Sequence, residues 1–143
     1  MDPAVLVAII TAAASIIAAA LSFVLTKIAE RRDVLQQRKL SHYQELLSAI
    51  SDLAIDDVDK DQANLNFSRA VNTIALVAPQ EVISALMEFH SEIKHSNPNR
   101  SLEAHDQKLR TLLLKMRKSL ELPFKDDPKT FNFHLIGSKP PKG

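Results

Sequence analysis

The sequence predicts an all-α protein, in which a single N-terminal transmembrane helix continues into a helical bundle of about four helices. Three observations support this fold. An uncharged apolar run covers residues 4–25, residues that favour helix dominate the rest of the chain, and glycine occurs only at Gly137 and Gly143. After the first run, apolar side chains recur at helical spacing. A chain of 143 residues with such a span leaves room for one small soluble domain.

The apolar run AVLVAIITAAASIIAAALSFVL has the length of a membrane span. As an α-helix it would be about 33 Å long, which matches a hydrocarbon core of about 30 Å. A buried core helix and a cleaved signal peptide are the alternatives. A signal peptide fits poorly, because the basic residues Lys27, Arg31 and Arg32 follow the run and do not precede it. Since positive residues stay on the cytoplasmic side, we expect a single-pass protein with residues 1–26 as the transmembrane segment and the N-terminus outside.

The predicted span has two different faces. Bulky side chains such as Ile9, Ile16 and Phe23 lie on one side. Small or hydroxyl side chains share the other side at helical spacing: Ala8, Thr11, Ser15, Ala18 and Ser22. Small residues let helix backbones approach closely in lipid, and hydroxyls can bond across the contact. We therefore expect this face to pack against identical copies; the alternatives are an alanine-rich anchor and a hydroxyl stripe that lines a narrow water path.

The remaining chain divides into a predicted cytoplasmic helical bundle, residues 27–122, and an extended C-terminal tail, residues 123–143. No glycine or proline stands between Leu25 and Asp56, so the first helix is expected to continue to about that point. Its later apolar positions follow helical spacing: Leu40, Tyr43, Leu47, Ile50 and Leu53. The acidic residues within 56–61 lack the glycine and the final glutamate of a calcium loop, so they predict a loop and a helix N-cap.

Three further helices are expected, at about residues 61–78, 79–95 and 101–120, with a turn at SNPN between the last two. The apolar stripe of the last helix is expected to pack in the core: Leu102, Leu109, Leu112, Leu113, Met116 and Leu120. In the tail, Phe131, Phe133 and Leu135 alternate with polar residues, which predicts an extended segment over the bundle or a neighbour.

Composition excludes several kinds of chemistry. The chain has no cysteine, so disulfides, thiolate metal sites and cysteine nucleophiles are absent from it. Its five histidines show no metal-binding spacing, and no glycine-rich loop precedes Gly137. The formal net charge of +1 provides no global field toward nucleic acid. We expect no cofactor and no metal.

One pair of residues remains as a candidate catalytic site. Arg100 and His105 form an R-x4-H motif at the start of the last helix. A histidine can exchange protons with a 2′-hydroxyl, and an arginine can stabilise phosphate charge, so the pair suits RNA cleavage. The alternative is structural: an arginine at a helix start and a histidine packed on an apolar stripe need no catalysis. The nearby Glu103 and Asp106 argue against a polyanion at this place.

With its N-terminal span, its helices and its R-x4-H motif, the chain resembles the small membrane-anchored HEPN-like accessory proteins of type VI-B CRISPR systems. The resemblance implies an oligomeric pore or membrane-permeabilising effector of antiviral defence in the bacterial inner membrane. It also implies the lipid bilayer and identical copies as partners, and a CRISPR effector complex or its RNA as a further partner. Ser101 departs from the usual HEPN pattern, which has Asn, Asp or His after the arginine, and this weighs against nuclease activity.

Two other functions stay open. One is a membrane-tethered HEPN ribonuclease that uses Arg100 and His105. The other is a non-catalytic membrane anchor that presents its helical bundle to a partner.

Overall fold

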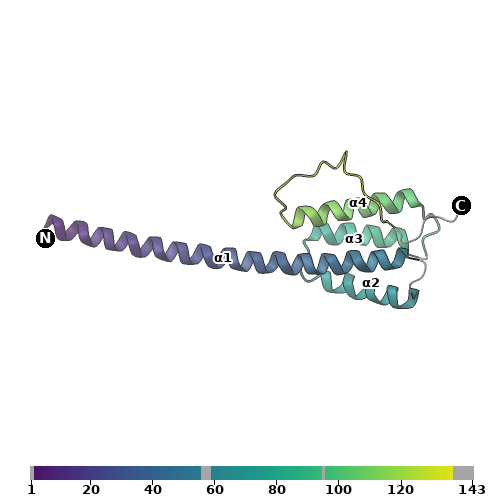
Figure 1. Ribbon diagram of the computed structural model, residues 1–143, viewed down its shortest axis with the longest axis horizontal. Coiled ribbons are helices and arrows are strands. Elements are labelled where there is room, and N and C mark those ends of the chain that lie inside the picture. Colours follow the sequence, from purple (N-terminus) through teal and green to yellow (C-terminus); the bar gives the residue numbers. More distant parts are fainter. Residues whose placement is uncertain (1, 56–58, 95, 137–143) are drawn as a thin grey trace. The chain divides into compact units, whose positions relative to one another are not determined.

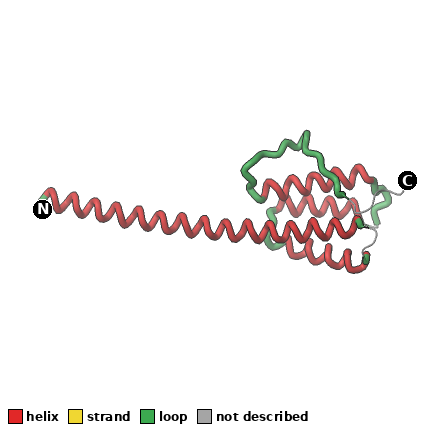
Figure 2. The backbone as a smooth tube through the Cα atoms, viewed as in Figure 1, coloured by secondary structure: helices red, strands yellow, loops and turns green. Residues whose placement is uncertain are grey.

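The computed structural model describes residues 2–55, 59–94 and 96–136. Within these residues the chain forms four helices and no strand (Figure 1, Figure 2). The helices are α1 (Pro3–Ala54), α2 (Lys60–Ile74), α3 (Gln80–Ile93) and α4 (Leu102–Ser119). The prediction of an all-helical fold is therefore confirmed. Residue contacts divide the chain into two compact units, residues 1–37 and residues 38–143.

The first unit contains the apolar part of α1. The helix begins at Pro3, which needs no N–H partner there, and the Asp2 carboxylate accepts a hydrogen bond of 3.0 Å from the Ala4 N–H. The most apolar stretch of the helix has a mean hydropathy of 2.6 and none of it is buried. Bulky side chains such as Ile16 and Phe23 are 70% and 64% exposed. This part of α1 has the length and composition of one membrane span.

The second unit is a helical bundle around one apolar core. The C-terminal part of α1 contributes Tyr43, Leu46 and Ile50 to this core, and α3 and α4 pack directly against each other. The largest fully buried side chains come from all four helices: Leu46, Ile50, Ile74, Val82, Leu86, Phe89, Leu109 and Leu112. Their removal from water supplies the main force that holds the helices together.

Side chains also cap the helix ends in the second unit. The Asp59 carboxylate accepts hydrogen bonds from the N–H groups of Asp61 and Gln62 at the start of α2, as predicted for the acidic run, whose residues 56–58 lie outside the described residues. The Ser101 hydroxyl accepts a bond of 3.1 Å from the Ala104 N–H at the start of α4. These caps explain where the two helices begin.

The helix α2 is shorter than predicted, because it ends at Ile74 and not at Ala78. The N–H groups of Leu76 and Val77 bond to the carbonyls of Thr73 and Ile74 over 3.1 Å, which tightens the chain into turns. A residue before proline avoids helical backbone angles, and Pro79 follows these turns directly.

Two leucines expected in the core are exposed instead. Leu40 is 44% exposed and Leu102 is 77% exposed. Leu102 is the first residue of α4, and Leu40 lies one turn before the first buried residue of α1, so each stands at an end of the packed region. Leu46, which the predicted stripe left out, is fully buried. Helical spacing does not show how far the facing helices extend.

The end of α4 is bonded to α1 through a small polar cluster. The Lys39 ammonium donates a bond of 2.8 Å to the Ser119 carbonyl and one of 3.3 Å to its hydroxyl. The hydroxyl groups of Tyr43 and Ser119 are 2.7 Å apart. Burial raises the pKa of the Tyr43 phenol, and the bond to Ser119 opposes that effect only in part. Lys39 thus supplies a partner for a carbonyl that the helix end leaves open.

The described part of the tail, residues 123–136, contains no helix and packs on the core through alternate side chains. Phe133 and Leu135 are half-buried against the core. The residues that precede them, Asn132 and His134, are exposed. This is the extended arrangement that the alternating pattern predicted. Residues 137–143 lie outside the described residues.

Arg117 of α4 holds the beginning of the tail. Its Nε and Nη2 atoms donate bonds of 2.8 and 2.9 Å to the Asp126 carboxylate. The guanidinium also lies over the rings of Phe124 and Phe131, at 5.3 and 5.6 Å from their centres. The paired hydrogen bonds hold the pKa of the Asp126 carboxyl below its usual value of 3.8.

We predict that Leu109→Ala destabilises the bundle by about 2–5 kcal/mol, because it removes a fully buried side chain from α4. Leu102→Ala, the same substitution in the same helix, should change stability by less than about 0.5 kcal/mol because Leu102 is exposed. Denaturant unfolding of the full-length protein in detergent can be followed by tyrosine fluorescence, since the chain has one tyrosine, the buried Tyr43, and no tryptophan. Equal effects of the two substitutions would contradict the assigned core.

A second prediction concerns the attachment of the tail. Because the folded pKa of Asp126 is below 3.8, its bond to Arg117 should be fully present above pH 3.8 and lost as the pH falls through the lower folded value. A spin label at Lys129→Cys, in a chain without other cysteines, should be immobile above that pH and become mobile in acid. Asp126→Asn should make the label mobile at every pH. Lys125→Gln, a control in the same segment, should not, and equal mobility of the two variants would disprove the tie.

Candidate functional site

The predicted packing face of the span lies on the uncovered part of α1. All five of its residues are exposed: Ala8, Thr11, Ser15, Ala18 and Ser22. The Thr11 hydroxyl donates a bond of 2.9 Å to the Val7 carbonyl, and the Ser15 hydroxyl donates one of 3.0 Å to the Thr11 carbonyl. One turn after Ser22, Thr26 bonds in the same way to the Ser22 carbonyl. These three hydroxyls therefore have partners inside their own helix, and their side chains lie close to the helix backbone.

The boundary after the span carries a basic side chain that bends back over the helix. The Lys27 ammonium lies 5.6 Å from the centre of the Phe23 ring and 3.2 Å from the Glu30 carboxylate. A lysine that covers an apolar ring with its stem and keeps its charge near a carboxylate suits the interface between lipid and water.

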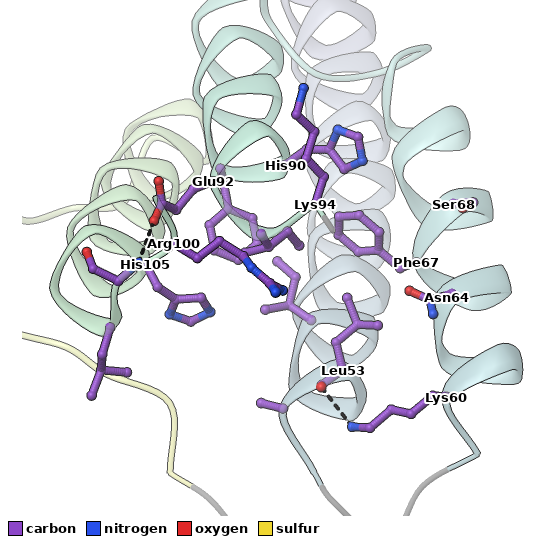
Figure 3. Close-up of a pocket in the computed structure, with 16 residues that line it drawn as sticks. Leu53, Lys60, Asn64, Phe67, Ser68, His90, Glu92, Lys94, Arg100 and His105 are labelled. Carbon is purple, nitrogen blue, oxygen red and sulfur yellow. Dashed lines mark hydrogen bonds between the residues drawn. The ribbon is translucent and has the colours of Figure 1, made fainter. Parts of the chain in front are cut away.

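The second unit contains an open pocket of about 790 Å³, lined by side chains from all four helices and from the turn before α4 (Figure 3). Its apolar wall includes Ile50, Phe67, Phe89 and Ile93, and polar side chains surround that wall. Arg100 and His105, the two candidate catalytic residues, both line this pocket. The structure thus brings the predicted pair to one place, although it gives the two residues different surroundings.

Arg100 stands in the turn between α3 and α4 with an exposed side chain. Its position is set by the next residue, because the Ser101 N–H donates a bond of 3.1 Å to the Glu92 carboxylate and the Ser101 hydroxyl caps α4. Figure 3 shows the guanidinium of Arg100 pointing into the space between His105 and Phe67. No hydrogen bond or ion pair of this guanidinium occurs within the described part of the chain.

His105 lies one turn into α4 and is largely packed. Its ring meets the buried Phe89 ring edge to face, with the centres 5.3 Å apart. The Nδ1 atom is 3.3 Å from the Asp106 carboxylate, and the side chain is 27% exposed. Its polar partner is thus the next residue of the same helix. These contacts suit a packed histidine that presents one edge to the pocket.

The pocket also contains residues that the sequence analysis did not single out. The Lys60 ammonium donates bonds of 2.9 and 2.6 Å to the carbonyls of Leu53 and Ile55 at the end of α1, and the His90 ring stacks on Phe67 with centres 6.1 Å apart. Lys94 lines the pocket as well. No sequence spacing identifies this group, because its members come from separate helices that only the fold brings together.

The charged side chains that line the pocket are mostly basic. Lys60, Lys94 and Arg100 line it, and among the described lining residues Glu92 is the one carboxylate. One carboxylate beside three cations leaves the described lining of the pocket with an excess of positive charge, and Glu92 also accepts the Ser101 N–H. Glu103 and Asp106, which were expected to disfavour a polyanion at this place, are not among the lining residues, but the Asp106 carboxylate lies 3.3 Å from the Nδ1 atom of the lining residue His105. That expectation stays a prediction.

Nothing outside the chain itself identifies the site. A comparison of the chain with models of protein families, with curated proteins and with solved structures found no match. Within the described residues, no group of three His, Cys, Asp or Glu side chains is placed to hold a metal ion. The chemistry of the site therefore has to be argued from the side chains described above.

We predict that His105→Ala lowers the stability of the bundle by about 1 kcal/mol, because it removes the ring contact with Phe89. His42→Ala is a matched control: its side chain is 26% exposed, nearly the same as His105, but its only described partner is an exposed Glu45 carboxylate at 3.9 Å. That substitution should change stability by less than about 0.5 kcal/mol. Thermal melts of the full-length variants test this, and a His105→Ala melt equal to that of the native protein would exclude a packing role.

Proposed function

We propose that this protein is a membrane-anchored homo-oligomer whose spans assemble through their small face and permeabilise the membrane. The observation that carries the proposal is the uncovered apolar part of α1, of which no residue is buried by the chain itself. An apolar surface of this length requires another environment, and acyl chains together with copies of the same helix provide one.

The two faces of the span support assembly between identical helices. The face with Ala8, Ser15 and Ala18 allows close approach of two backbones, whereas Ile16 and Phe23 suit contact with acyl chains. Thr11 and Ser15 already bond within the helix, so these two hydroxyls can enter the hydrocarbon region with their donors paired. In a ring of spans that pack through this face, small polar side chains at the edge of each contact would border a central axis, where water and ions could pass.

The cellular setting is part of the same proposal. Lys27, Arg31 and Arg32 after the span favour a cytoplasmic location for the second unit and an outside N-terminus, in the inner membrane of a bacterium. The resemblance to type VI-B accessory proteins supports a HEPN-like bundle, a role in antiviral defence, and a CRISPR effector complex or its RNA as partner.

A membrane-tethered ribonuclease is the second candidate, and one observation favours it: Arg100 and His105 line the same pocket. The contacts of His105 argue against it. A general acid or base has to reach the substrate, whereas this ring packs edge to face on Phe89 and its side chain is only 27% exposed. We therefore propose membrane permeabilisation, and not RNA cleavage, as the main activity.

The test uses full-length protein in lipid nanodiscs and in liposomes. Ala18→Leu, which fills the small face, should reduce the oligomer to smaller species and suppress leakage of a trapped ion. Ile16→Leu, which keeps the size of a side chain on the opposite face, should preserve both. A native protein that is monomeric by mass measurement and does not leak ions would leave only a plain membrane anchor.

The same preparation decides about the second candidate. Labelled RNA should remain intact with the native protein. Cleavage that is abolished by Arg100→Ala or His105→Ala while the oligomer persists would replace the proposed function by the ribonuclease.

A further inference from the structure

We infer that residues 27–37 of α1, here called the neck, bind the neck of a second copy of this chain through two unlike faces. Asp33 on one face pairs with Arg31 on the other face of the next copy. The inference rests on the proposed assembly of identical spans and states which helix surfaces meet beyond the apolar run. All the residues that carry it belong to the first unit, residues 1–37.

The neck is a helical surface without cover from its own unit. Every residue from Lys27 to Leu35 is exposed. The apolar side chains of Ile28 and Leu35 are 58% and 56% exposed, although both follow the uncharged run. Burial of these side chains against a partner would remove apolar surface from water and is therefore favourable.

Charge distinguishes the two sides of the neck. Asp33 follows Ser15 by about five whole turns of an α-helix, so it continues the small face of the span. Ile28, Arg31 and Leu35 follow one another at helical spacing and form one stripe on the opposite side. The neck therefore has an acidic face in line with Ser15 and a basic, partly apolar face behind it.

Both charged groups lack a partner in the described part of the chain. Neither the Asp33 carboxylate nor the Arg31 guanidinium has a hydrogen bond or an ion pair within these residues. Lys27 and Glu30, by contrast, are paired with each other at 3.2 Å. The carboxylate of one neck and the guanidinium of the next are complementary in charge, which favours contact between unlike faces.

A closed ring of copies brings these two groups together. In such a ring each copy contacts its neighbours with two different faces and without a shift along the ring axis. Asp33 and Arg31 then differ in height by about 3 Å, the rise of two residues, which an arginine side chain can bridge.

A pair of copies related by a two-fold axis has the opposite electrostatics. Its small face would meet itself, so Asp33 would lie close to Asp33 of the partner subunit, and the like charges would repel each other. Charge complementarity therefore favours the ring over the pair.

The first experiment measures the mass of the full-length protein in nanodiscs and over a dilution series in mild detergent. Asp33→Arg and Arg31→Asp should each weaken assembly at least about tenfold, because like charges then face each other. The combined variant Asp33→Arg/Arg31→Asp exchanges the two charges and should assemble like the native protein. Arg69→Asp is the matched control, since Arg69 is exposed and has no described ion pair but lies on α2, and it should leave assembly unchanged.

The second experiment identifies the faces that meet, in a chain without cysteine of its own. An equimolar mixture of the Asp33→Cys and Arg31→Cys variants should form covalent dimers with a short bismaleimide. Neither variant should form them alone. Covalent dimers from Asp33→Cys alone would show that the small face meets itself and would overturn the inference.

The mass of the native protein separates this inference from the proposed function. A monomeric native protein would overturn both. An oligomer that Ala18→Leu disrupts, but that Asp33→Arg and Arg31→Asp leave intact, would overturn the inference alone. Failure of the combined variant to restore assembly would also overturn it.

Discussion

The side chains of the long helix α1 lie in two very different environments, and the division of the chain into two units depends on this difference. A helix pairs its backbone polar groups internally, so it can continue from an apolar environment to a solvated one without exposing unpaired groups to lipid. The apolar residues up to Leu25 have no cover from the chain, whereas Tyr43, Leu46 and Ile50 on the same helix are buried in the bundle core. The core therefore assembles on the end of a helix whose other part requires a partner outside the chain.

The turn before α4 gives the bundle its chemical character. Glu92, Asn97 and Ser101 hold the turn through their hydrogen bonds, and no ion pair between Glu92 and Arg100 occurs among the described residues. Ser101 caps the helix in this position. The same residue thus helps to hold the turn that carries the neighbouring guanidinium. Ser101 caps α4, and Arg100, the residue directly before it, adds positive charge to the pocket. The cap and the charge of the pocket therefore depend on two consecutive residues.

Local sequence signals were sufficient for the elements but not for their limits or for the pocket. The run without glycine or proline predicted α1, the acidic residues predicted the Asp59 cap, and alternation predicted how Phe133 and Leu135 pack. The burial of Leu40 and Leu102 was predicted wrongly, because periodicity describes one helix and burial depends on the length of its neighbours. The grouping of Lys60, His90 and Arg100 depends on the packing of separate helices, and no spacing along the chain encodes it.

The bond between Lys39 and Ser119 bears on how the protein is made. Its two residues are 80 positions apart in the sequence. Tyr43 and Ser119, whose hydroxyls are also hydrogen-bonded, are 76 positions apart. During synthesis the N-terminal helix leaves the ribosome first, while its partner in this cluster leaves near the end. The apolar surface around Tyr43 therefore stays uncovered until α4 has been synthesised. In this interval the growing chain exposes apolar surface beyond the apolar N-terminal part of α1. Contacts with chaperones and premature association are therefore most favoured before the last helix is complete.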